Sequence, residues 1–258
     1  MRTIKAQRIV VKIGTSALIG RNGFLDIRTI KSLAVQIAKI KISGKEILIV
    51  TSGAIGVGMK EISLKSRPKD VVMQKLCAAI GQPMLVSKYH SLFQKHGIKI
   101  AQILLTYESL SNKKIYNNLR NSIKKMLDLG IVPIINENDP ISLDKNGPSF
   151  GDNDMLSAML SLKIGADFLI MLTDVDGLFD KNHKDAHLIK EVDGINKNIT
   201  SLAYGADKFG LGGMKTKLKA AKLATKAGLT VVIANARVKN VLAKIVDNQE
   251  IGTILYPN

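Results

Sequence analysis

The sequence VVKIGTS, residues 10–16, is an apolar run that ends in small polar residues, and it reads as the first strand of a buried sheet. It places Lys12 inside that run. An ammonium removed from water without a partner costs several kcal/mol, so a buried lysine implies an anion. Alternatively, Lys12 lies at the end of the strand and its ammonium reaches the solvent. The strand by itself leaves both interpretations open.

Short apolar runs of the same kind recur along the chain, and amphipathic segments separate most of them. Apolar residues at helical spacing from Ile27 to Ile40 predict one helix that ends near Ser43-Gly44. This alternation predicts an α/β fold, a three-layer sandwich with a central, mostly parallel sheet and helices on both faces. The predicted strands are residues 8–13, 46–51, 98–105, 131–136, 167–173 and 229–234.

The composition is typical of a globular protein and argues against a membrane-spanning one. A chain of 258 residues that is 46% hydrophobic can bury a large core. No apolar run approaches the ~18 residues that span a bilayer, and the first residues lack the apolar segment of a signal peptide. We therefore expect a cytoplasmic protein without a membrane partner. The single cysteine, Cys77, lies among apolar helical neighbours and is predicted to be a core residue.

The formal net charge of +17 would suit a nucleic-acid-binding protein. However, the basic residues are mostly lysines scattered singly, and aromatic residues make up only 4% of the chain, which leaves few surfaces for base stacking. A positive surface would equally attract a small polyanion such as a nucleotide. We expect no nucleic-acid partner, although charge alone leaves that alternative open.

Polar residues follow four of the predicted strands. In open parallel sheets, ligands bind beyond the carboxyl ends of the strands. Each polar segment alone could be a turn or a helix cap. Together they predict one rim lined with carboxylates and with backbone groups that bind anions: Gly14-Thr15-Ser16, Thr51-Ser52-Gly53-Ala54, Asn136-Glu137-Asn138-Asp139 and Thr173-Asp174.

Two further stretches carry clustered charges. Residues 151–160, GDNDMLSAML, begin a helix with Asp152 and Asp154, and with Glu137 and Asp139 they would concentrate four acids on one rim. Such a cluster needs lysines, Mg²⁺ or a substrate ammonium nearby. Residues 210–221, GLGGMKTKLKAA, open a helix with two lysines that oppose its dipole, which favours a bound phosphate.

We predict no metal site built from protein ligands. The run LTDVDGLFD, residues 172–180, lacks the glycine and glutamate spacing of a calcium loop. His183 and His187 are four residues apart but have no third ligand beside them.

Taken in chain order, seven motifs resemble the amino-acid kinase family and, within it, the glutamate 5-kinases. They are VKIGTS (11–16), IVTSGAI (49–55), AAIGQ (78–82), IVPIINEND (131–139), GDND (151–154), LTDVDGL (172–178) and GGMKTK (212–217). Family members that act on acetylglutamate, aspartate, carbamate or uridylate typically carry a Gly-Gly pair after the first lysine, where this chain has Gly14-Thr15-Ser16.

The resemblance implies transfer of the ATP γ-phosphoryl group to the side-chain carboxylate of L-glutamate, the first step of proline biosynthesis. It also implies Mg²⁺ that accompanies ATP and bridges its phosphates. Two alternatives are kept. One is another kinase of the same fold, acting on acetylglutamate or uridylate, and the other is a basic nucleic-acid-binding protein.

The resemblance also implies a role for individual residues. Lys12 and Lys217 would clamp the phosphates from opposite sides, Asp154 would hold both lysines, and Asp139 would meet the substrate ammonium. The residues expected at ATP are Lys12, Gly14, Thr173, Asp174, Leu211, Gly212, Gly213, Met214, Lys215, Thr216 and Lys217. Those expected at glutamate are Ser52, Gly53, Ala54, Asp139 and Asn153.

Finally, the resemblance implies a single amino-acid kinase domain over residues 1–258, without the C-terminal PUA domain of many relatives. Its acceptor half would extend to about residue 170 and its nucleotide half would follow from about 171. A homo-oligomer, a dimer or tetramer, is expected, with contacts through a helix around residues 71–93. Leu211 replaces a small polar residue of many relatives, and Pro83 is predicted to bend or end its helix.

Overall fold

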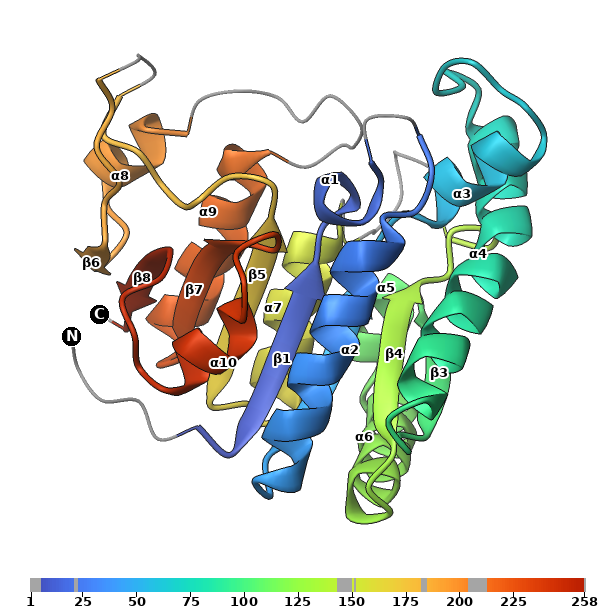
Figure 1. Ribbon diagram of the computed structural model, residues 1–258, viewed down its shortest axis with the longest axis horizontal. Helices are drawn as coiled ribbons and strands as arrows, with labels where there is room; N and C mark the ends of the chain where they lie inside the picture. Colours follow the sequence, from blue (N-terminus) through green and yellow to red (C-terminus); the bar gives the residue numbers. More distant parts are fainter. Residues whose placement is uncertain are drawn as a thin grey trace.

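A computed structural model describes residues 6–20, 23–142, 150, 152–181, 185–203 and 213–257. Its strands are β1 (Arg8–Ile13), β2 (Glu46–Thr51), β3 (Ile100–Leu105), β4 (Val132–Glu137), β5 (Phe168–Thr173), β6 (Glu191–Asp193), β7 (Thr230–Asn235) and β8 (Thr253–Tyr256). They form one eight-stranded sheet in the order β3-β4-β2-β1-β5-β7-β8-β6 (Figure 1). Neighbouring strands are parallel except for β7 and β8. The predicted mostly parallel sheet is therefore confirmed.

All of the strands predicted from apolar runs are present, and their ends shift by no more than two residues. The sequence prediction missed β6 and β8, which are only three and four residues long. Runs this short carry too few residues to show an alternating pattern. Strand β6 and the short helix α8 (Lys197–Ser201) both lie in the long segment between β5 and α9.

Helices cover both faces of the sheet, which confirms the three-layer arrangement. They are α1 (Thr15–Leu18), α2 (Ile27–Ile42), α3 (Ala54–Glu61), α4 (Val71–Gln94), α5 (Tyr107–Ser111), α6 (Lys113–Asp128), α7 (Asn153–Lys163), α8 (Lys197–Ser201), α9 (Met214–Lys226) and α10 (Val241–Val246). The core on one face includes residues of α2, α4 and α10, and the core on the other includes residues of α5, α6, α7 and α9. Figure 1 shows α2 on the near side of the sheet and α7 behind it. Within the described residues, no helix is both long and apolar enough to cross a membrane.

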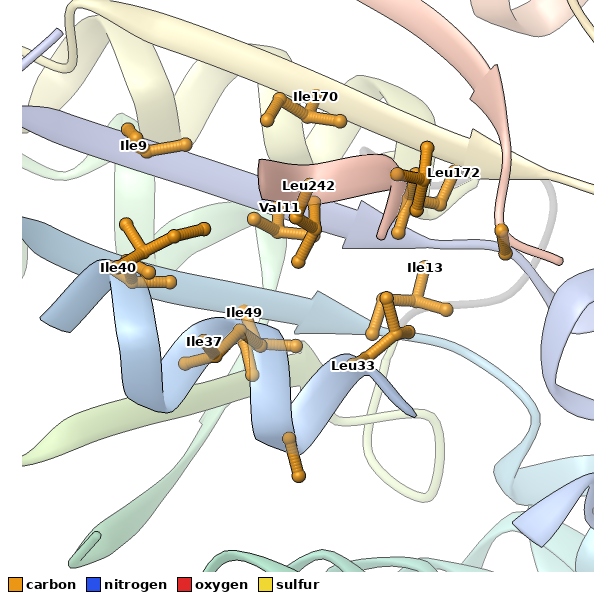
Figure 2. Packing of buried hydrophobic residues seen from close by; sticks show 14 of the residues in the cluster. Ile9, Val11, Ile13, Leu33, Ile37, Ile40, Ile49, Ile170, Leu172 and Leu242 are labelled. Carbon is orange, nitrogen blue, oxygen red and sulfur yellow. The ribbon is translucent and has the colours of Figure 1, made fainter. Parts of the chain in front are cut away.

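Strand β1 shows how the two cores divide its side chains. Ile9, Val11 and Ile13 pack against α2 and α10, as Figure 2 shows, whereas Val10 belongs to the core beneath α7 and α9. Successive side chains of a strand point to opposite faces. Lys12 therefore points to the same face as Val10, into the layer of α7 and α9.

Helix α4 continues through Pro83 to Gln94, so the prediction that Pro83 ends the helix is wrong. Proline removes one helical hydrogen bond. The following turns are nevertheless held in place, because Leu85, Tyr89 and Phe93 are buried against the sheet. Cys77 on the same helix is buried, as predicted.

Helices α3 and α4 touch through their backbones. A Cβ added at Gly58 would lie 1.8 Å from the carbonyl oxygen of Cys77, and one added at Gly81 would lie 1.9 Å from the carbonyl oxygen of Ala54. No carbon atom fits at these distances, so one helix would have to move. Two glycines thus set the spacing of the helices that flank the end of β2.

We expect Gly58→Ala to lower the free energy of unfolding by about 2 kcal/mol or more, since the added methyl group forces α3 away from α4. Gly56→Ala in the same helix is the matched control. A Cβ there meets nothing closer than Ile19 Cγ1 at 3.5 Å, and helix propensity favours alanine. Urea unfolding of the two variants and the wild type measures the difference. Equal stability of the two variants would contradict the close contact.

Candidate active site

A cavity of about 160 Å³ opens at the carboxyl ends of β1, β2 and β4. Three of the four predicted polar segments contribute to it, and Thr173-Asp174 after β5 does not line it. The predicted rim is therefore formed mainly by the first three segments and the start of α7. The lining residues are Lys12, Gly14, Thr15, Ser52, Gly53, Ala54, Ile55, Gly56, Arg67, Gln74, Asn136, Glu137, Asp139, Asp152, Asn153, Asp154 and Lys217.

Two lysines share one carboxylate at the inner end of the cavity. Lys12 Nζ lies 2.5 Å from Asp154 Oδ1, and Lys217 Nζ lies 3.3 Å from Asp154 Oδ2. Lys12 is 5% exposed, Lys217 is 3% exposed and Asp154 is fully buried. The interpretation in which Lys12 reaches the solvent is therefore wrong. The structure brings the three predicted catalytic residues together from β1, α7 and α9.

The ends of α7 and α9 place these side chains. Asp152 precedes α7 and accepts hydrogen bonds from the backbone N–H groups of Asp154 and Met155, which holds Asp154 in the first turn. Thr216, in the first turn of α9, donates a hydrogen bond of 2.8 Å to Asp154 Oδ2. The first turns of the two helices are thus joined at the carboxylate that holds the lysines.

Charge is out of balance in this buried cluster. Burial alone would raise the pKa of Asp154, but the ammonium groups of Lys12 and Lys217 outweigh it and hold that pKa below its usual range. Burial lowers the pKa of Lys12, and Asp154 only partly offsets this effect. Two ammonium groups face one carboxylate, so an anion entering the cavity would restore neutrality. The cluster suits phosphate or carboxylate binding.

The segment Ser52-Gly53-Ala54 leads into the first turn of α3 and lines the cavity. Gly53 precedes α3 with φ +98°, a left-handed conformation that favours glycine. The first N–H groups of a helix have no intrahelical partner, and the helix dipole makes that end positive. Ala54, Ile55 and Gly56 all line the cavity, so the start of α3 adds a second anion-binding feature.

Three amide side chains form a hydrogen-bonded chain beside the site, in which Asn136 and Gln82 are buried and Asn153 is half-buried. Asn153 Nδ2 donates to the carbonyl of Thr51 at 2.8 Å, to Ser52 Oγ at 3.0 Å and to Asn136 Oδ1 at 2.8 Å. Asn136 Nδ2 in turn donates to Gln82 Oε1 at 2.8 Å. Sequence analysis placed Gln82 in a motif but assigned it no role.

The lining of the cavity also includes the carboxylates of Glu137 and Asp139 and the guanidinium of Arg67. Burial raises the pKa of Asp139 to about 6, and the nearby Arg67 partly opposes that shift. Burial and the charge of Asp139 raise the pKa of Glu137. Sequence analysis missed Arg67, because it lies between two helices in a polar segment without a recognisable pattern.

Only some of the residues predicted to hold the nucleotide line the cavity. Lys12, Gly14 and Lys217 line it. Thr173 is buried at the end of β5, whereas Asp174 and Lys215 are exposed. Gly213 and Met214 are half-buried at the start of α9. Leu211 and Gly212 lie outside the described residues, so their predicted roles stay predictions.

The described residues contain no group of three or more His, Cys, Asp or Glu side chains arranged to hold a metal ion. His187 instead lies next to Asp180 at the surface, with its Nδ1 atom 3.6 Å from Asp180 Oδ2. His183 lies outside the part of the chain that the structure describes.

Comparison with known sequences adds independent findings. A model described as the amino acid kinase family matches residues 7–235. The glutamate 5-kinase of Methanosarcina barkeri is 47% identical over 260 residues, which cover 96% of this chain and 67% of the relative. The glutamate 5-kinase of a Marinomonas species is 45% identical and covers 98% of this chain and 68% of the relative. This chain thus spans about two thirds of the length of both relatives.

Solved structures share the fold at low sequence identity. The UMP kinase of Bacillus anthracis superposes with a TM-score of 0.68 and 17% identity, over 100% of this chain and 98% of that chain. The carbamate kinase of Giardia lamblia, solved with AMP-PNP, gives a TM-score of 0.70 and 16% identity, over 98% of this chain and 99% of that chain. These similarities extend over whole chains and concern the fold alone.

Proposed function

Because the chain belongs to the amino acid kinase family and its curated relatives are glutamate 5-kinases, we propose that it transfers the γ-phosphoryl group of ATP to the side-chain carboxylate of L-glutamate. The product would be L-glutamyl 5-phosphate, the first intermediate of proline biosynthesis. The observation that carries the proposal is the buried cluster of Lys12, Asp154 and Lys217 beside the cavity.

The chemistry of this transfer fits the side chains of the site. A carboxylate with a pKa of about 4.3 is already ionised at neutral pH, so the acceptor needs no general base. The site must supply alignment and positive charge along the path of the phosphoryl group. Lys12 and Lys217 supply that charge, and Asp154 fixes both ammonium groups in position.

ATP would extend from these lysines toward Thr173, Asp174 and the first turn of α9. Mg²⁺ would enter with ATP and neutralise phosphate charge. The donor set supports ligation mainly by the phosphates, because the described residues provide no metal-binding cluster and the inner cavity carries excess positive charge.

Glutamate would occupy the rest of the cavity. Its side-chain carboxylate would face Lys12, Lys217 and the N–H groups at the start of α3. Its ammonium would lie between Asp139 and Asn153, since both offer acceptor oxygens. Among the described lining residues, Arg67 is the remaining cation, and it would face the α-carboxylate.

The raised pKa of Asp139 predicts how activity depends on pH. We expect kcat/KM for glutamate to be about tenfold lower at pH 5 than at pH 7, because a protonated Asp139 cannot pair with the substrate ammonium. The substrate side chain stays mostly ionised over this range. Steady-state kinetics of the wild type and of Asp139→Asn test this, and the variant should lose this dependence. A flat wild-type profile would remove Asp139 from the ammonium site.

The function is tested by supplying ATP and Mg²⁺ with glutamate, aspartate, acetylglutamate or UMP in separate reactions. We expect ADP release only with glutamate, together with an acyl phosphate that hydroxylamine traps as a hydroxamate. Turnover with UMP or acetylglutamate but not with glutamate would favour another kinase of this fold. Tight binding to single-stranded or duplex nucleic acid with a steep salt dependence would support the remaining alternative.

We further propose a cytoplasmic homo-oligomer built from a single kinase domain, with an acceptor half to about residue 170 and a nucleotide half from about 171. Helix α4 supports the oligomer, since it exposes Val72 (72%) and Leu76 (48%) along one side. A second copy that covers this side would bury them. Sedimentation of Leu76→Glu beside the wild type tests the contact, because the variant should dissociate.

A further inference from the structure

The amides of Asn136 and Asn153 each have one allowed orientation. The backbone N–H of Glu137 donates to Asn136 Oδ1 at 2.9 Å, and a backbone N–H can only donate. The carbonyl of Thr51 accepts from Asn153 Nδ2 at 2.8 Å, and a carbonyl can only accept. Backbone groups at both places therefore fix which end of each amide is oxygen.

This orientation turns an oxygen of Asn153 away from the network. Its Nδ2 group is used by Thr51, Ser52 and Asn136, whereas Asn153 Oδ1 is buried and has no hydrogen-bond partner among the described residues. Asn153 lines the cavity. A buried acceptor without a donor costs about 1–3 kcal/mol, so the folded protein maintains an acceptor that a ligand can satisfy.

Gln82 forms the end of the row of hydrogen-bonded amides that lies farthest from Asn153. Its Oε1 accepts from Asn136 Nδ2 at 2.8 Å, and both side chains are more than nine-tenths buried. Gln82 follows Gly81, whose Cα packs against the backbone at Ala54 of α3. The contact between α3 and α4 thus fixes the backbone beside Gln82.

We propose that Gln82 is a positioning residue that, through Asn136, fixes the orientation of the Asn153 amide and so keeps its unpaired Oδ1 available to bind a primary ammonium. The inference rests on the proposed function and extends it to substrate selection. Asn153 Oδ1 and the carboxylate of Asp139 are both acceptors and belong to residues that line the cavity, so this part of the site favours a cationic donor. A dicarboxylate without an amino group would leave Asn153 Oδ1 unpaired, which a site built for hydrogen bonding penalises.

The test compares glutamate with glutarate, which has the same two carboxylates and no amino group. The readout is the ratio of their kcat/KM values, or the inhibition constant of glutarate where its turnover is too slow. Gln82→Met removes the acceptor at similar volume, and we expect it to lower the preference for glutamate about tenfold. The kcat/KM or inhibition constant of glutarate, whichever is measured, and the KM for ATP should change less than about twofold.

Three further variants complete the experiment. Gln82→Glu keeps an oxygen for Asn136 and should retain the preference. Gln94→Met, at the exposed end of the same helix, is the matched control and should match the wild type. Asn136→Leu breaks the chain one step nearer the cavity and should lower the preference at least as much, so it tests the inference if Gln82→Met does not fold.

The outcomes separate the two proposals. A folded Gln82→Met that keeps the wild-type preference, or that weakens glutamate and glutarate by the same factor, would overturn the role of Gln82. In both cases the wild type would still phosphorylate glutamate. A wild type that does not phosphorylate glutamate would instead overturn the proposed function.

Discussion

Replacing Lys12 with methionine is expected to lower kcat for glutamate phosphorylation about a hundredfold to a thousandfold while the protein remains folded. The ammonium would stabilise negative charge on the transferring phosphoryl group, and removing one such group from a preorganised site typically costs ~10²–10³ in kcat. Folding should survive, because Asp154 keeps its contacts with Lys217 and Thr216.

Steady-state kinetics with glutamate and ATP measure this effect, and circular dichroism with thermal unfolding establishes that the variant is folded. Lys39→Met, at an exposed position of α2, is the matched control and should retain full activity. If the folded Lys12→Met enzyme turns over within about tenfold of the wild type, Lys12 is not part of the catalytic site.

Asp154→Asn is expected to be the most damaging change to stability. It removes the carboxylate that neutralises Lys12 and Lys217 and leaves two like charges buried side by side. Breaking a buried ion pair by removing one partner costs about 3–5 kcal/mol. Activity should fall as well, because neither ammonium keeps its position.

The pH dependence of this loss provides a second check. Without Asp154 the pKa of Lys12 should fall further below its usual value, so the folded variant binds fewer protons than the unfolded chain. Stability then rises with pH as long as the unfolded lysine is still protonated. Urea unfolding at pH 7 and at pH 9.5 should therefore show a smaller deficit at the higher pH.

Asp128→Asn is the control for this experiment, since Asp128 forms an exposed pair with Lys124 on α6. An exposed pair contributes little, and the change should stay within about 1 kcal/mol. An Asp154→Asn variant as stable as the wild type would mean that Asp154 does not neutralise charged lysines in the folded protein.

The fold was largely predictable because its central strands are long and apolar. β1 and β2 were predicted at their observed ends, since buried parallel strands contain little else than Val, Ile and Leu. The strands β6 and β8 have only three and four residues, too few to show a pattern of their own, and they were missed. The prediction that Pro83 would end its helix failed because the burial of α4 outweighs one lost hydrogen bond.

The site was predictable only where a motif marked it. The burial of Lys12 could not be decided from β1, because the answer depends on α7 and α9 covering that face of the sheet. Arg67 and the orientation of Gln82 left no trace in local sequence, since each is defined by contacts between distant segments. The order of the motifs was enough to identify the family. The geometry of the cavity could be described only from the folded structure.

The glycine contact between α3 and α4 gives these helices the properties of a single stiff body. Flexible side chains between helices can absorb a small displacement by changing rotamer, but backbone atoms already in contact cannot. A displacement of α4 toward α3 would therefore also displace the first turn of α3, whose residues line the cavity. Through Gly58 and Gly81, a movement of α4 at the surface of the molecule would change the position of the residues of α3 that line the cavity.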